Sequence, residues 1–270
     1  MYVDSHCHLS FPDLAARLAE LRAEMHAAKV GRALCICTTL EEFDQVHALA
    51  LAHDNFWATA GVHPDNEGVR EPTVADLLAL AARPRVVAIG ETGLDYFRLN
   101  GRSVAEMAWQ RERFRVHIRA AQQTGLPLVI HTRSASADTL EVLTAEGKRE
   151  VRGVFHCFTE TLEVARAALD LGFYISFSGI LTFKTADDLR AVARFVPLNR
   201  CLIETDSPYL APVPFRGKTN TPALLPWVAG KMAELKGVSV EEIARVTSEN
   251  FEQLFNIAAE NCDAPPQQVL

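Results

Sequence analysis

Two histidines lie one residue apart near the beginning of the sequence, in the segment MYVDSHCHLS at positions 1–10. Side chains alternate between the two faces of a β-strand, so His6 and His8 would point the same way if this segment is extended. Neutral imidazole is a common metal ligand, and two converging imidazoles suggest a metal site. The HxH pair alone does not decide the matter, because two surface histidines give the same pattern.

Other side chains that ligate metals follow apolar segments later in the chain, at His63, Glu91, His131, His156 and Asp206. A single histidine after an apolar segment is more often a hydrogen-bonded buried residue than a metal ligand. Several such residues form a site only if the fold brings the ends of their segments together. The strands and helices that position them decide this.

Short β-branched segments alternate with longer amphipathic segments along the chain, which is typical of repeated βα units and a parallel sheet. Eight strands are expected near residues 2–6, 33–37, 57–62, 86–91, 128–131, 153–156, 173–178 and 201–204. Helices are expected at 12–28, 40–53, 74–82, 105–124, 137–146, 162–171, 186–195, 223–236 and 240–257. Eight βα repeats in 270 residues predict an α/β fold, a single-domain (β/α)8 TIM-type barrel.

A doubly wound open sheet is the alternative fold. It would usually carry a glycine-rich phosphate loop after an early strand, and the sequence has neither GxGxxG nor GxxxxGK[ST]. No fixed repeat, low-complexity segment or charge block divides the chain. We therefore expect one barrel domain over residues 1–260 and a loose C-terminal tail over residues 261–270.

The composition excludes several classes of protein. The chain is 49% hydrophobic with a formal net charge of −7, which indicates a globular protein and disfavours broad non-specific coating of nucleic acid. No apolar segment approaches the ~18 residues of a membrane helix, and a strand beginning at residue 2 leaves no signal peptide, so we expect a cytoplasmic protein. The six cysteines lack CxxC spacing and are expected to be reduced. No feature indicates membrane contact or an obligate protein partner.

The carboxyl ends of the strands of such a barrel form one rim, where the active sites of this fold lie. We expect this rim to gather six metal ligands, namely His6, His8, Glu91, His131, His156 and Asp206. Four imidazoles and two carboxylates exceed what one four-coordinate ion needs, so two divalent ions are expected. Mixed imidazole and carboxylate ligation suits zinc or manganese, and magnesium less well.

The expected roles of these ligands follow from position and charge. His6 and His8 would hold one ion. His131 and His156 would hold the other. Glu91 arises between the two pairs and has two anionic oxygens, so it is the natural bridge.

Asp206 would bind the first ion and accept a proton from the attacking water, which makes it and Glu91 the predicted catalytic residues. A metal ion lowers the pKa of bound water from about 15.7 to about 7, which supplies a nucleophile at neutral pH. The pattern thus predicts a metal-dependent hydrolase.

Residues around the rim are expected to contact the substrate or to support the ligands. The candidates for substrate binding are His63, Arg133, Arg216, Lys218 and Tyr209. Basic side chains would bind phosphate and Tyr209 would stack on a base. The same residue types also occur as solvated surface residues or in ordinary packing. Asp4, which shares the parity of His6, and Asp95, which lies near Glu91, are expected to orient imidazoles.

Six segments occur in the order DSHCHL, GVHP, IGETGLDYF, VIHTR, FHCF and ETDSPYLAPVPFRGKTN. In this order they resemble the TatD family of metal-dependent deoxyribonucleases, which are amidohydrolase-type barrels, from residue 2 to about residue 255. The resemblance implies two divalent ions on the six ligands, magnesium-dependent activity, and hydrolysis of phosphodiester bonds as a 3′→5′ exonuclease. Its substrates would be DNA ends and, as an extension, RNA.

The sequence departs from this family at two positions. Asn220-Thr221-Pro222 stands where such proteins usually carry asparagine–glutamate–proline, and Asp65 stands where a second histidine often follows His-Pro. Both departures spare the metal ligands but bear on substrate preference.

The site chemistry alone leaves other functions open. A bridging hydroxide serves carbonyl carbon and phosphorus alike, so a binuclear amidohydrolase, a lactonase or an aminoacyl-ester (aminoacyl-tRNA) deacylase is the alternative. A metal-binding protein without turnover is a third class, which open coordination positions disfavour. Arg133 and Lys218 favour phosphate. The main prediction is therefore a hydrolase acting on phosphoric ester bonds.

Overall fold

Eight parallel strands form one sheet in the computed structural model, which describes residues 1–257. The strands follow the chain order around the sheet. They are β1 (Tyr2–Cys7), β2 (Val30–Cys35), β3 (Phe56–Ala60), β4 (Val86–Asp95), β5 (Leu128–Arg133), β6 (Gly153–Phe155), β7 (Tyr174–Phe177) and β8 (Cys201–Ile203). The tail predicted at 261–270, the domain end at 260 and Cys262 lie outside the described residues.

The first and last strands meet just beyond their carboxyl ends. Cys7 and Ser207 form a parallel bridge, and His8 N donates to Ser207 O at 2.9 Å. Asp206 N donates to His6 O at 3.0 Å. These contacts join β1 to the segment after β8 and confirm the predicted barrel.

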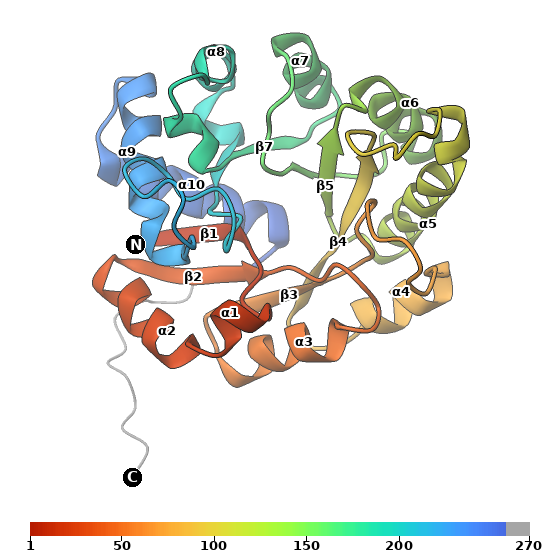
Figure 1. The fold of residues 1–270 in the computed structure, drawn as a ribbon, viewed down its shortest axis with the longest axis horizontal. Coiled ribbons are helices and arrows are strands. Elements are labelled where there is room, and N and C mark those ends of the chain that lie inside the picture. Colours follow the sequence, from red (N-terminus) through yellow and green to blue (C-terminus); the bar gives the residue numbers. More distant parts are fainter. Residues whose placement is uncertain (258–270) are drawn as a thin grey trace.

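The helices lie around the outside of the strands (Figure 1). They are α1 (Pro12–Ala15), α2 (Leu18–Ala27), α3 (Phe43–Ala52), α4 (Val74–Ala81), α5 (Ala108–Thr124), α6 (Ser136–Gly147), α7 (Leu162–Asp170), α8 (Asp187–Phe195), α9 (Leu225–Lys236) and α10 (Val240–Phe255). Short 3₁₀ turns are η1 (Ala105–Met107), η2 (Gly179–Thr182), η3 (Leu198–Arg200) and η4 (Pro222–Leu224). Within residues 1–257, none of the helices is long and apolar enough to cross a membrane.

The helix predicted at 12–28 is two helices in the structure. Arg17 leaves the helical backbone conformation (φ −119°, ψ 18°), and α2 begins at the next residue. The break allows Leu14 of α1 and Leu21 of α2 both to be buried in the core. The apolar spacing alone did not reveal this change of direction.

The barrel interior is filled by its own apolar cluster, separate from the larger core between strands and helices. Helix α10 contributes to it and lies across the amino ends of the strands, where Ser248 donates to Met1 O and Asn250 donates to Leu198 O and Cys201 O. The cluster consists of Val3, Leu34, Ile36, Trp57, Ala88, Val129, Val154, Tyr174, Leu202, Phe251, Leu254 and Phe255. Packing at this end leaves the carboxyl end of the barrel for a site.

Strand β4 is longer than predicted, because it continues beyond Glu91 to Asp95. Gly93 permits this: a Cβ there would lie 2.0 Å from His131 O, so only glycine lets β4 approach β5 so closely. Glu91 therefore lies inside a strand, and Asp95 is held opposite Arg133 of β5.

Candidate metal centre

Glu91 lies at the centre of a cluster of imidazoles at the carboxyl end of the barrel. It is 2% exposed, and its Oε1 is 2.9 Å from His156 Nε2. The same oxygen is 3.3 Å from His63 Nε2 and 3.3 Å from His131 Nδ1. Strands β4 and β5 and the segments after β3 and β6 thus bring three imidazoles to one oxygen.

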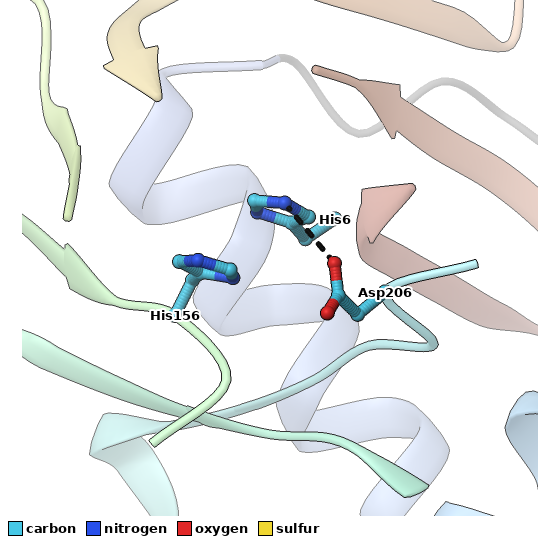
Figure 2. A group of neighbouring side chains, drawn as sticks. All are labelled: His6, His156 and Asp206. Atoms are coloured by element: carbon cyan, nitrogen blue, oxygen red, sulfur yellow. Dashed lines mark ion pairs between the residues drawn. The ribbon is translucent and has the colours of Figure 1, made fainter. Parts of the chain in front are cut away.

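The other oxygen of Glu91 faces the HxH pair. Glu91 Oε2 is 3.3 Å from His6 Nε2 and 4.0 Å from His8 Nε2. Asp206 Oδ1 lies 3.6 Å from His6 Nε2 and 3.4 Å from His8 Nε2. Figure 2 shows His6 and Asp206 pointing toward one another, with the His156 ring stacked on that of His6 at 3.8 Å between centroids. One carboxylate therefore faces two groups of imidazoles, one through each oxygen.

Two of these imidazoles are supported by buried carboxylates. His131 Nε2 donates to Asp95 Oδ2 at 2.9 Å, and His156 Nδ1 donates to Glu204 Oε1 at 3.2 Å. Asp95 is 5% exposed and Glu204 is fully buried. The other nitrogen of each ring faces Glu91 and offers its lone pair when the ring is neutral. This is the arrangement in which an acidic partner orients a metal-binding histidine.

The HxH histidines have no such support. His6 Nδ1 and His8 Nδ1 are buried and have no hydrogen-bond partner among residues 1–257. Their rings are held by packing, since His6 stacks on His156 and His8 stacks on Phe11 at 4.7 Å between centroids.

Charge and burial act in opposite directions on these groups. Burial raises the pKa of Glu91, but the imidazoles around it, His156 first, hold its pKa well below the ordinary value. Burial lowers the pKa of His131, but its interactions with Asp95 and Glu91 together outweigh this and the pKa is raised. Burial also lowers the pKa of His156, while Glu91 and Glu204 raise it well above the ordinary value. Protons and metal ions therefore compete for the same nitrogens.

These residues fit divalent metal ions. His156 Nε2 is buried and has no hydrogen bond in the described part of the chain although it lies 2.9 Å from Glu91 Oε1, so an imidazole nitrogen and a carboxylate oxygen converge there without a hydrogen bond between them. Imidazole and carboxylate together suit borderline divalent ions. Three groups have all their ligand atoms within 4.8 Å of one another: His6, His156 and Asp206; His6, His8 and Glu91; His63, Glu91 and His131.

Comparison with known proteins shows which family the chain belongs to. The model of the TatD related DNase family matches residues 3–256. The chain belongs to the TatD family. It is 49% identical to YcfH of Escherichia coli (strain K12), a metal-dependent hydrolase, over 95% of this chain and 96% of YcfH.

A second relative is the 3′-5′ ssDNA/RNA exonuclease TatD of Citrobacter rodentium, which is 35% identical over 88% of this chain and 91% of the relative. The crystal structure of YjjV, a TatD homologue from Escherichia coli K12, superposes with a TM-score of 0.87 at 28% identity, covering 95% of this chain and 98% of that chain. The predictions of the family, of the barrel and of a metal-dependent hydrolase are confirmed.

Asp4 does not orient an imidazole in this TatD-family chain, so that prediction is wrong. Its fully buried carboxylate accepts from His6 N at 3.2 Å, Thr205 N at 3.0 Å and Thr205 Oγ1 at 2.5 Å. Burial is the main reason that the pKa of Asp4 is raised, to about 7. Asp4 instead connects β1 to the segment that carries Asp206.

The loop after β8 fixes Asp206. This residue has a left-handed backbone conformation (φ 56°), which is uncommon for a residue with a side chain. Buried Asn220 stabilises the loop, because its Nδ2 donates to Thr205 O at 2.8 Å and to Tyr209 O at 2.6 Å. Thr221, at the position where the family often has glutamate, is buried beside it.

The residues predicted to contact substrate differ in how far they lie from the imidazole cluster and in how exposed they are. His63 belongs to the centre itself. Tyr209 is 55% exposed, and its ring lies 6.5 Å from that of His8. Arg133 is exposed and stacks over Phe97 at 3.6 Å.

Two basic residues of the loop after β8 lie over aromatic rings. Arg216 packs over Phe183 at 3.7 Å, and Lys218 lies 5.9 Å from the Phe215 ring. Both are exposed. The structure shows neither of them in contact with the imidazole cluster.

Sequence reasoning missed Glu204. This residue was treated only as the end of a strand, yet it is the buried partner of His156. The signal was present in the segment ETDSP, because Glu204 has the same parity as Asp206, as Asp4 has with His6.

Proposed function

We propose that this protein is a metal-dependent nuclease that removes nucleotides from the 3′ ends of DNA, and of RNA, by hydrolysis. Its membership of the TatD family supports this, as does the relative named as a 3′-5′ ssDNA/RNA exonuclease. The observation that carries the proposal is the position of Glu91, whose two oxygens face two separate groups of imidazoles. That arrangement suits a carboxylate shared by two ions.

The proposed ligands are His6, His8, Glu91, His131, His156 and Asp206, with magnesium, manganese or zinc as the ions. When bound, such ions lower the pKa of water and neutralise charge on the attacked phosphate. In this proposal Asp206 would accept the proton of the water. Burial raises its pKa, but its hydrogen bond with His8 and the nearby imidazoles lower it overall, so the carboxylate is ionised at neutral pH.

Positions at the rim suit the ends of a nucleic acid. Exposed Tyr209 is available to stack on a base, and such stacking tolerates any sequence. Exposed Arg133, Arg216 and Lys218 would contact phosphates further along the strand. A cytoplasmic location is part of the proposal, supported by the five cysteines of the described region, which are all free thiols.

The test uses protein stripped of metal and reloaded separately with magnesium, manganese or zinc. Each sample is incubated with end-labelled single-stranded DNA, duplex DNA and RNA, beside Asp206→Asn. Asp170→Asn, an exposed residue that ends α7, is the matched control. A metal-dependent ladder shortening from the 3′ end, lost only in Asp206→Asn, is expected. Protein that binds about two ions but cleaves no nucleic acid would overturn the nuclease assignment in favour of a carbonyl ester substrate.

A further inference from the structure

His63 differs from the other histidines of the centre in where its ring carries a proton. The backbone N–H of Asp65 donates to His63 Nδ1 at 3.0 Å. A nitrogen that accepts a hydrogen bond must offer its lone pair, so Nδ1 has no proton and the ring proton is on Nε2. That Nε2 is the atom 3.3 Å from Glu91 Oε1. His63 therefore presents an N–H to the centre.

The supported ligands show the opposite arrangement. His131 and His156 donate their outer N–H to Asp95 and Glu204, so in the neutral ring it is the nitrogen facing Glu91 that has the free lone pair. A metal ligand needs that lone pair. Although His63 is as close to Glu91 Oε1 as His131 is, its ring is turned for hydrogen-bond donation.

The segment around His63 is held firmly from both sides. His63 N donates to Thr38 O at 2.9 Å, and Asn66 Nδ2 donates to the same carbonyl at 2.8 Å. Arg113 of α5, which is 2% exposed, donates to His63 O at 2.7 Å and to Asn66 O at 2.8 Å. The main-chain donor at Asp65 is thus fixed relative to the ring. Any residue but proline supplies that donor, so the departure from the family at position 65 leaves it intact.

We propose that His63 donates a hydrogen bond from Nε2 to a phosphoryl oxygen of the substrate and is not a metal ligand. The side chain is 19% exposed, so a ligand at the rim reaches it. Glu91 Oε1, its acceptor in the structure, is shared with His131 and His156. A phosphoryl oxygen gives this N–H an acceptor of its own. The identity of the acceptor rests on the proposed function; the position of the proton does not.

The first test needs no nucleic acid. Two-bond ¹H–¹⁵N correlation spectra of the metal-loaded protein, assigned with His63→Gln, are expected to show the His63 proton on Nε2. Metal analysis is expected to find unchanged metal content in His63→Gln and His63→Asn, and a lower content in His131→Ala. His26→Gln, at an exposed position on α2, is the control. A proton on Nδ1, or metal lost with His63, would overturn the proposal.

The second test distinguishes the contribution of the N–H donor at Nε2 from that of the imidazole ring of His63. The amide of glutamine places an N–H near the position of Nε2, whereas that of asparagine lies near Nδ1. With inorganic phosphate as the probe, His63→Gln is expected to stay within a few-fold of native affinity, and His63→Asn to lose about tenfold, as for one hydrogen bond to a charged group. Equal affinity in both variants would overturn the role. If native protein binds phosphate in this pattern but cleaves no nucleic acid, only the nuclease assignment fails.

Discussion

The two sides of the metal centre are built differently, although each contributes two histidines. On the carboxylate-supported side, His131 and His156 each donate an N–H to a buried carboxylate, Asp95 and Glu204. These partners fix the orientation of each ring and the nitrogen that faces the centre. Such support also makes a ligand nitrogen more basic, which strengthens its bond to a metal ion.

On the packed side, His6 and His8 rely on neighbouring rings. Their Nδ1 atoms are buried and unpartnered within the described chain, while His156 and Phe11 hold the rings by stacking. Stacking restrains the plane of a ring but leaves the choice of protonated nitrogen open. If two ions bind as proposed, one site is preorganised by hydrogen bonds and the other is completed only when its ion binds. We therefore expect two classes of metal affinity, with the carboxylate-supported side tighter.

The largest expected effect comes from Glu91→Gln, because this residue serves both sides. The variant is expected to lose both ions and at least about 10³-fold in activity, since metal ions contribute several kcal/mol to such a reaction. Metal analysis after dialysis and the rate of DNA cleavage measure this, with Asp170→Asn as the control. Retention of one ion at native affinity would show that Glu91 belongs to a single side.

Glu204→Gln is expected to act on one side only. Loss of the carboxylate behind His156 should weaken one ion by about 10- to 100-fold, as for other partners of metal-binding histidines, and leave the second ion unchanged. Because Glu204 is one of the two carboxylates that raise the pKa of buried His156, removing its charge should make the metal-free variant less stable than the native protein. Calorimetric metal titration and urea unfolding test both parts. Asp95→Asn should weaken the same ion, and equal weakening of both ions contradicts the comparison.

The smallest expected effect comes from Phe11→Leu on the packed side. The variant removes the ring stacked on His8 but keeps an apolar side chain. An aromatic pair contributes about 0.5–1.5 kcal/mol, so the weaker ion should bind about 2- to 10-fold less tightly while the tighter ion is unaffected. The same titration measures it. A change in the tighter ion would mean that the assignment of the two affinities to the two sides is reversed.

The convergence of the six proposed ligands was predictable from the sequence, because strand ends of a parallel barrel meet at one rim whatever their separation in the chain. His6 and Asp206 are far apart in sequence but lie 3.6 Å apart through Nε2 and Oδ1. This prediction needed only the number and order of strands, and errors of a few residues in their ends did not matter.

The hydrogen-bond partners of the ligands were not predictable in this way. Parity placed Asp4 beside His6, but the nearest donors to its carboxylate belong to Thr205, about 200 positions away. Glu204 was missed for the same reason, because the sequence does not show which acid reaches which ring. The extension of β4 past Glu91 depends on Gly93, a residue that more often ends or weakens a strand.

The closed amino end of the barrel limits where substrate can enter and where product can leave. Phe251, Leu254 and Phe255 of α10 belong to the apolar cluster that fills the interior, so nothing passes through the barrel. Substrate must therefore enter, and product must leave, at the carboxyl end of the barrel. An enzyme that shortens a strand would then have to release each nucleotide past the strand it is still holding, or let go of the strand at every step.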